Sequence, residues 1–295
     1  MDWIKSLQNA INYVENNLTE EIDIDKVAKI ANSSPFNFQR VFSILCNYTL
    51  GEYIRNRRLS LAGSELASTD QKVIDVALKY GYESPESFTR AFVRFHGINP
   101  SQVKKKGGSL KIFSKISVKL ILDGGSLMDY RIEKHDEFKI ISKKKYFPIV
   151  SMEESQKDIP KFWDKCNKDN TVSTLINKYL EKDSFLNNVI IGACFENSDR
   201  KDEFPYGIGV FYNGNKVEKD FEIDTIPSLN WAKFKCIGPM PKALQTLLKS
   251  IYSEFFPSSE YKPSGGYYLE LYPQGDVTSN TYESEIWISV DKKEW

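Results

Sequence analysis

The first hundred residues carry apolar side chains at the spacing of amphipathic helices. The spacing predicts an opening helix, a short and a longer helix, a long central helix, then a second short and longer pair before a brief closing helix. In chain order, the predicted helices span residues 2–18, 22–31, 34–46, 50–68, 73–80, 84–96 and 100–106. A short helix, a tight turn and a second helix form the helix-turn-helix layout, which the pattern predicts twice.

One nine-residue motif occurs twice in this helical part. SPFNFQRVF at 34–42 and SPESFTRAF at 84–92 both read Ser-Pro-x-x-Phe-x-Arg-x-Phe. In each copy, Ser can cap the helix and Pro can take its first position, where a missing N–H costs nothing. The two Phe residues, four apart, share one helix face and are expected in the core, so Arg40 and Arg90 must point elsewhere. A lone Arg on a helix would be read as solvated, but two in the same frame favour a pair of major-groove readers.

The pattern changes after residue 108. Residues 109–129 alternate apolar and polar positions in part, which predicts a strand and a hinge-like connection. Further strands are predicted at 130–142, 189–196, 207–214, 229–237, 267–271 and 284–290, and helices at 159–168, 172–182 and 241–255. A strand–helix–strand–strand unit used twice predicts an α+β domain with one curved antiparallel sheet and helices on one face. We therefore expect a helical domain at 1–107, a connecting segment at 108–127 and an α+β domain at 128–295.

Composition adds little to this picture. With 40 Lys and Arg against 40 Asp and Glu, the net charge of zero neither supports nor excludes a nucleic-acid partner. The chain has two histidines and four dispersed cysteines, so we expect no metal site, no cofactor and no disulfide framework. The polar, amphipathic N-terminus is unlike a signal peptide, and no apolar run approaches the ~20 residues of a membrane span. We expect a cytoplasmic protein.

The sequence VIDVALKYGYESPESFTRAFVRFHGINPSQ, at 73–102, resembles the AraC/XylS-type DNA-binding domain, and the resemblance covers residues 3–106. It implies seven helices with two helix-turn-helix motifs joined by a long helix. It also implies DNA contacts from the first turns of both reading helices. By position these are Pro35, Phe36, Gln39 and Arg40 in the first helix, and Pro85, Glu86, Ser87, Thr89 and Arg90 in the second. Glu86 departs from the family's usual neutral donors; it could accept from a cytosine amino group or face solvent.

The back half resembles the GyrI-like effector-binding domain over residues 128–291. The resemblance rests on WAKFKCIGPMPKALQTLLKSIYSEFFPSSEYKPSGGYYLELYP at 231–273 and ESEIWISV at 283–290. It implies a multidrug-binding type of site for lipophilic, often cationic molecules, with aromatic walls and a buried acid. The candidate acids are Glu270 and Glu285, and the candidate walls are Tyr268, Trp287, Trp163, Phe195, Tyr206 and Trp231. Strand alternation puts Glu270 on one face with Tyr268, and Glu285 with Trp287, but leaves open which face is inner.

These features favour a sequence-specific DNA-binding transcription regulator that responds to a small lipophilic or cationic effector. Its expected partners are promoter duplex DNA, the effector and RNA polymerase, with no membrane. Two alternatives remain open. One is a hydrolase in which a pocket Glu acts as general base, although no Ser-His-Asp, Cys-His, metal or phosphate-loop arrangement is recognisable. The other is a ligand-free protein-interaction module.

Overall fold

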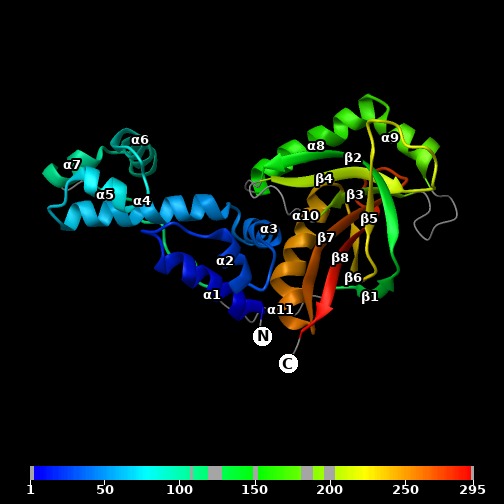
Figure 1. Cartoon of the computed structure of the whole chain (residues 1–295), viewed down its shortest axis with the longest axis horizontal. Coiled ribbons are helices and arrows are strands. Elements are labelled where there is room, and N and C mark those ends of the chain that lie inside the picture. The colour runs from blue at the N-terminus through cyan, green and yellow to red at the C-terminus, as the bar shows by residue number, and fades with distance from the viewer. Residues whose placement is uncertain are drawn as a thin grey trace. The chain divides into compact units, whose positions relative to one another are not determined.

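A computed structural model of the chain describes residues 3–106, 109–118, 128–148, 152–180, 189–195 and 203–293 (Figure 1). The front part folds into helices whose ends lie within two residues of the predicted ones. They are α1 (Trp3–Asn16), α2 (Ile24–Ile30), α3 (Pro35–Cys46), α4 (Leu50–Ser68), α5 (Val73–Lys79), α6 (Pro85–His96) and α7 (Pro100–Lys106). The helical fold predicted for this part is confirmed.

The duplicated motif produces the same local structure twice. The side chains of Ser34 and Ser84 each accept a hydrogen bond from the backbone N–H three residues later, and Pro stands at the first helical position in both copies. Phe88 and Phe92 are fully buried, with ring centroids 5.3 Å apart, and the equivalent rings of α3 lie 6.0 Å apart. Capping and the four-residue Phe spacing thus start and orient both helices as predicted.

The contacts divide the chain into two compact units that differ from the expected domains. The helical unit contains residues 4–32 and 49–121, and the sheet unit contains residues 1–3, 33–48 and 122–295. Helix α3 therefore groups with the C-terminal sheet, although it carries the first copy of the motif. Part of the connecting segment groups with the helices.

The core of the helical unit lies where α4, α5, α6 and α7 meet. It is built from Leu59, Ala62, Leu66, Val76, Ala77, Tyr80, Phe88, Phe92 and Val103. Arg57 and Arg58 of α4 serve the fold. Arg57 forms a salt bridge with Glu15 at 2.8 Å, and Arg58 donates to the backbone oxygen of Leu18 at 2.7 Å.

The prediction of a strand within residues 109–129 is wrong for residues 109–118, the part that the structure describes. This segment, which we call the strap, is assigned to no strand; residues 119–127 lie outside the described residues. Backbone N–H groups of the strap donate to side chains of the helical unit. The pairs are Lys111 to His96 Nδ1 (3.1 Å), Phe113 to Ser60 Oγ (3.1 Å), Ile116 to Tyr53 Oη (3.1 Å) and Val118 to Gln8 Oε1 (2.8 Å). The apolar–polar alternation thus reflects a chain laid along helices, without a neighbouring strand.

The sheet unit has an eight-stranded antiparallel sheet in the part of the chain that the structure describes, in the order β1-β6-β8-β7-β3-β4-β2-β5. The strands are β1 (Tyr130–His135), β2 (Phe138–Pro148), β3 (Val189–Cys194), β4 (Glu203–Phe211), β5 (Glu222–Ile226), β6 (Leu229–Ile237), β7 (Tyr261–Pro273) and β8 (Glu283–Lys292). The helical segments are α8 (Met152–Lys168), α9 (Thr171–Thr174), the π-helix η1 (Leu175–Tyr179), α10 (Lys242–Ser250), the π-helix η2 (Ile251–Phe255) and α11 (Phe256–Ser258).

The predicted repeat is present, with one additional strand in each copy. The single strand expected at 130–142 is interrupted at residues 136–137 and forms β1 and β2, while β5 was not predicted. Both halves then follow the order strand, strand, helix, strand, strand. The two halves meet at the centre of the sheet, where β3 pairs with β7. Each half also places its first strand beside the other half, since β1 pairs with β6 and β5 pairs with β2.

The two faces of the sheet have different cores. On one face, residues of α8 and α10 pack against strand residues such as Tyr206 and Ile286. The cluster on the other face comes from the strands and their ends, with Trp231, Trp287 and Phe195 among its members. No helix in the described parts of the chain is both long and apolar enough to cross a bilayer.

His96 ties the strap to the helical unit in a way that depends on protonation. Its Nε2 lies 2.9 Å from the backbone oxygen of Leu59, while Nδ1 accepts from Lys111, which requires the neutral ring with hydrogen on Nε2. Burial lowers the pKa of His96. Because the folded pKa lies below the unfolded value, the unfolded chain takes up the proton first. The stability contributed by neutral His96 is therefore lost as the pH falls below about 6.5.

We predict that protection of the α4 and α6 amides against hydrogen exchange decreases from pH 7.5 to pH 5.5, after correction for intrinsic exchange rates. The decrease should be clearly smaller in His96→Gln, because no imidazole remains to titrate. His135→Gln, which changes the other histidine, is the control and should keep the full decrease in these helices. An equal pH response in His96→Gln and the unmodified chain would contradict the assignment.

Candidate ligand-binding site

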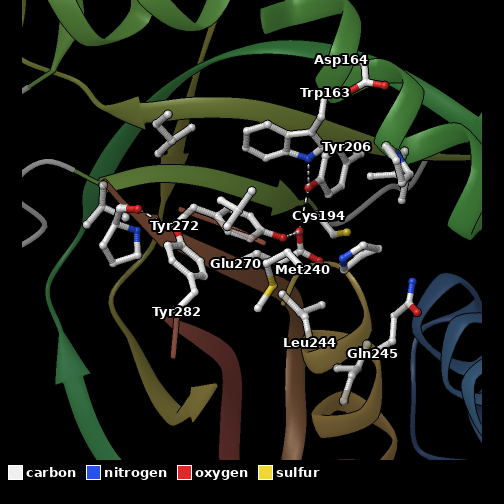
Figure 2. A pocket seen from close by; sticks show the side chains of 18 of the residues that line it. Trp163, Asp164, Cys194, Tyr206, Met240, Leu244, Gln245, Glu270, Tyr272 and Tyr282 are labelled. Atoms are coloured by element: carbon white, nitrogen blue, oxygen red, sulfur yellow. Dashed lines mark hydrogen bonds between the residues drawn. The ribbon is translucent and has the colours of Figure 1, made fainter. Parts of the chain in front are cut away.

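The carboxylate of Glu270 accepts hydrogen bonds from three tyrosines at the centre of the sheet. Figure 2 shows those from Tyr206 and Tyr272. Tyr206 Oη donates to Oε2 at 2.7 Å, Tyr268 Oη to Oε1 at 2.9 Å and Tyr272 Oη to Oε2 at 3.0 Å. Alternation along β7 puts residues 268, 270 and 272 on one face, and Tyr206 comes from β4. The acid is therefore held by donors from two strands.

Helix α8 extends this network with an indole group. Trp163 Nε1 donates a hydrogen bond to Tyr206 Oη at 2.9 Å, and the hydroxyl group of Tyr206 in turn donates to Glu270. The ring of Trp163 also meets Tyr272 edge-on, with centroids 5.2 Å apart. Figure 2 shows the indole above the tyrosines and the carboxylate. Helix position and acid orientation are thus coupled through one hydrogen-bonded chain.

Space for this cluster exists because the residue opposite Glu270 on β3 is Gly192. A Cβ at Gly192 would lie 2.2 Å from Tyr206 Oη and 2.7 Å from Glu270 Oε2. Any other residue would displace the phenol or the carboxylate. A glycine inside a strand often marks such a close approach, so the sequence did contain a signal for this position.

Burial dominates the electrostatics of the cluster. Burial raises the pKa of Glu270, and the three tyrosine hydrogen bonds and Arg40 only partly offset this rise. Burial and the negative charge of Glu270 also hold the pKa of Tyr206, Tyr268 and Tyr272 far above the ordinary value, so the phenols remain donors. An ionised carboxylate in such a place is stabilised by a nearby cation.

The cluster opens into a cavity of about 660 Å³ between α8, α10, α3 and the sheet. Its apolar lining includes Ile159, Phe204, Leu244 and Leu248. Its polar lining includes Glu270, Arg40, Asp164, Asn167, Gln245 and Gln274. A volume of this size and an apolar wall with a few oriented polar groups are typical of small-molecule sites.

Helix α3 supplies one wall and a positive charge. The guanidinium carbon of Arg40 lies 3.8 Å from the centroid of the Tyr268 ring, and Phe36 stacks on Phe204 with centroids 5.5 Å apart. Burial by itself would lower the pKa of Arg40, but Cys194, the neighbouring tyrosines and Glu270 raise it, so the group is charged.

Three expected wall or acid residues line the cavity, namely Glu270, Trp163 and Tyr206. Tyr268 is buried below Arg40 and bound to Glu270. Strand parity groups Tyr272 with Glu270, but Tyr272 was not among the candidate walls, and sequence reasoning did not place Arg40 here.

The remaining four candidates lie away from the cavity, which corrects the expectation for them. Trp231, Trp287 and Phe195 pack together on the opposite face of the sheet. Glu285 accepts from Arg131 at 2.8 Å and from Trp287 Nε1 at 2.7 Å. The reason is strand alternation, because β8 turns Ile286 and Ile288 toward the helices and so turns positions 285 and 287 away.

The expected DNA contacts have different surroundings in the two reading helices. In α6, Glu86 and Arg90 are exposed, while Pro85, Ser87 and Thr89 are half-buried. In α3, Phe36 and Gln39 are buried, and Pro35 and Arg40 are half-buried. Phe36 and Arg40 line the cavity of the sheet unit, so in this arrangement they are not presented to a duplex.

Comparison with known proteins matches both parts of the chain. The family model of integron-associated effector binding proteins matches residues 131–290, and a helix-turn-helix domain model matches residues 27–106. The transcriptional activator AarP of Providencia stuartii is 42% identical over 89 residues, which are 30% of this chain and 66% of AarP. The regulatory protein SoxS of Escherichia coli K12 is 36% identical over 106 residues, which are 36% of this chain and 99% of SoxS. The chain thus spans just under two thirds of AarP.

Among solved structures, SAV2435 bound to tetraphenylphosphonium is similar to this chain with a TM-score of 0.48 and 22% sequence identity. The match covers 56% of this chain and 94% of SAV2435.

We predict that Gly192→Ala lowers the free energy of unfolding by about 1–3 kcal/mol, because the new methyl group overpacks the phenol and carboxylate. Tyr206→Phe removes the atom that the methyl meets first. The loss of unfolding free energy in the double variant should therefore be about 0.5–2 kcal/mol smaller than the sum of the losses in the two single variants. Urea unfolding of the four proteins completes the cycle, and strictly additive losses would contradict the proposed contact.

Proposed function

This chain belongs to the AraC-type helix-turn-helix transcription regulators and carries a C-terminal effector-binding domain, and from this premise we propose that its effector is a small lipophilic cation. The relatives are regulators rather than enzymes, which leaves the hydrolase alternative without support. The cavity of about 660 Å³ favours a ligand over a ligand-free interaction module.

The observation that carries the proposal is the carboxylate of Glu270 in an aromatic, largely apolar cavity. Its ionised form is costly when buried alone, so a cation that enters gains the Coulomb attraction of the acid. A cation over an aromatic face gains about 2 kcal/mol more where water is excluded. A neutral molecule of the same shape forgoes both gains, and an anion is repelled. Charge rather than shape therefore selects the ligand.

On the DNA side, the exposed face of α6 supports direct contact with a duplex. Arg90 is suited to a phosphate or base edge, and Glu86 in the first turn can accept from a base amino group. AarP is described as an activator. We therefore include RNA polymerase among the partners of this chain.

We predict that the full chain binds tetraphenylphosphonium and not tetraphenylborate, which has nearly the same size and opposite charge. Glu270→Gln should weaken binding of the cation about tenfold or more, because it removes the acid and keeps the shape. Isothermal titration calorimetry measures both affinities. A change in tryptophan fluorescence that is lost in Trp163→Phe gives a second signal from the cavity.

Glu285→Gln is the matched control, since Glu285 lies in the same sheet outside the cavity. It should bind the cation as the unmodified chain does. Equal affinity for the two ions, or equal effects of the two Glu substitutions, would overturn the proposed ligand class.

We further predict that the chain binds fragments selected from random genomic DNA with an affinity that falls steeply between about 50 and 200 mM salt. Arg90→Ala should weaken this binding and, if Arg90 meets a phosphate, reduce the slope of log K against log salt by about one.

Arg94→Ala provides the comparison for this measurement. Arg94 is exposed on the same helix one turn farther from its N-terminus, and should contribute less. A flat salt response, or a larger effect at Arg94 than at Arg90, would contradict the proposed reading helix.

A further inference from the structure

The two copies of the motif differ on the helix face that carries the arginine. In α6 the positions four before and four after Arg90 are Glu86 and Arg94, and all three side chains are exposed. In α3 the equivalent neighbours of Arg40 are apolar: Phe36 and Ile44. A charged stripe suits water or a duplex, whereas an apolar stripe with one arginine needs a partner that covers it.

The partner of this α3 stripe is the cavity wall of the sheet unit. Phe36 stacks on Phe204 of β4, with ring planes inclined by 29°. Ile44 is buried in the same core cluster as Leu244 and Leu248 of α10. In Figure 1, α3 and α10 lie side by side. The stripe is thus seated at the rim of the site that the effector would enter.

Between these two contacts, Arg40 reaches the groups that define the cation site. Its guanidinium stacks over Tyr268, and the hydroxyl of that tyrosine donates to Glu270. Arg40 and Glu270 both line the cavity. A planar cation above an aromatic ring whose hydroxyl group binds a carboxylate is the arrangement expected for the effector itself.

We propose that Arg40 is an internal substitute for the cationic effector, and that binding of the effector expels Arg40 and releases the reading helix α3 for DNA. This inference rests on the proposed function, because it assumes that the cavity binds cations. Two positive charges close to one buried acid repel each other. Part of the binding free energy of the effector is therefore offset by the cost of displacing the Arg40 guanidinium.

The coupling has a defined direction. If α3 must leave the cavity before it can meet a duplex, effector and DNA favour the same released state. Each ligand then raises the affinity for the other by the same factor, as linkage requires. The unliganded chain binds both weakly, because only the fraction of molecules with α3 released is competent.

The decisive experiment measures tetraphenylphosphonium binding to the full chain without DNA. Arg40→Gln removes the competing charge and should bind the cation about tenfold more tightly than the unmodified chain. Arg90→Gln removes one positive charge at the equivalent position of α6, outside the sheet unit, and should keep the original cation affinity. Equal or weaker binding by Arg40→Gln would overturn the inference, because removing a residue that does not compete with the cation cannot raise its affinity.

The same measurement separates this inference from the proposed function. Cation binding that depends on Glu270, with no gain in Arg40→Gln, overturns only the role of Arg40. Failure of both the unmodified chain and Arg40→Gln to bind the cation overturns the proposed ligand class and this inference together.

A second test leaves the sequence of α3 unchanged. Tyr268→Leu removes the ring below Arg40 and should raise DNA affinity several-fold without effector, whereas Tyr268→Phe keeps the ring and should raise it less. Tetraphenylphosphonium should raise the DNA affinity of the unmodified chain. A fall in DNA affinity on adding the cation would overturn the inference. Circular dichroism verifies that the variants fold, and if Tyr268→Leu does not, the cation titration of Arg40→Gln decides.

Discussion

The cost of keeping one carboxyl group away from water shapes the C-terminal half of this protein. Glu270 stands on β7, and three tyrosine hydroxyl groups donate to its carboxyl group, which offsets only part of the pKa rise caused by burial. The arrangement requires a bare backbone at Gly192, phenols on two strands and an indole on α8. Because the hydrogen bonds compensate only part of the cost of burying this acid, we propose that the site binds a positively charged, lipophilic ligand.

The duplicated architecture explains why this site is where it is. β3 of the first repeat pairs with β7 of the second, and Gly192 and Glu270 face each other across this seam. Each repeat also contributes one helix, α8 or α10, to the same face of the sheet. Residues of both helices and of both seam strands line the cavity, so neither repeat could build it alone. The same two helices leave an opening that the aromatic and aliphatic side chains of α3 occupy.

The sequence predicts local structure well and three-dimensional neighbours less well. Caps at Ser34 and Ser84 and the four-residue Phe spacing predicted both reading helices, because these signals are contained in one turn of chain. Strand parity grouped Glu270 with Tyr268 but could not say which face was inner, since that depends on the strand order and on which face the helices cover. The sequence has apolar Phe36 and Ile44 at the positions where the second motif copy has Glu86 and Arg94. It does not show what covers them, because the partner of Phe36, Phe204, lies more than 150 residues away in the chain. The strap was predicted as a strand because alternating apolar and polar residues indicate an extended chain. The alternation does not show whether the backbone N–H groups bind a neighbouring strand or, as here, side chains of helices.

The strap extends the helical unit beyond the end of its last helix. The helix-turn-helix match stops at residue 106, but the side-chain acceptors on α1, α4 and α6 are satisfied by backbone from 111 to 118. A module cut at the end of α7 would expose the ring of His96 and the hydroxyls of Ser60 and Tyr53 to solvent. A fragment that keeps the helical unit intact therefore has to extend beyond residue 118, which forms the last of these hydrogen bonds.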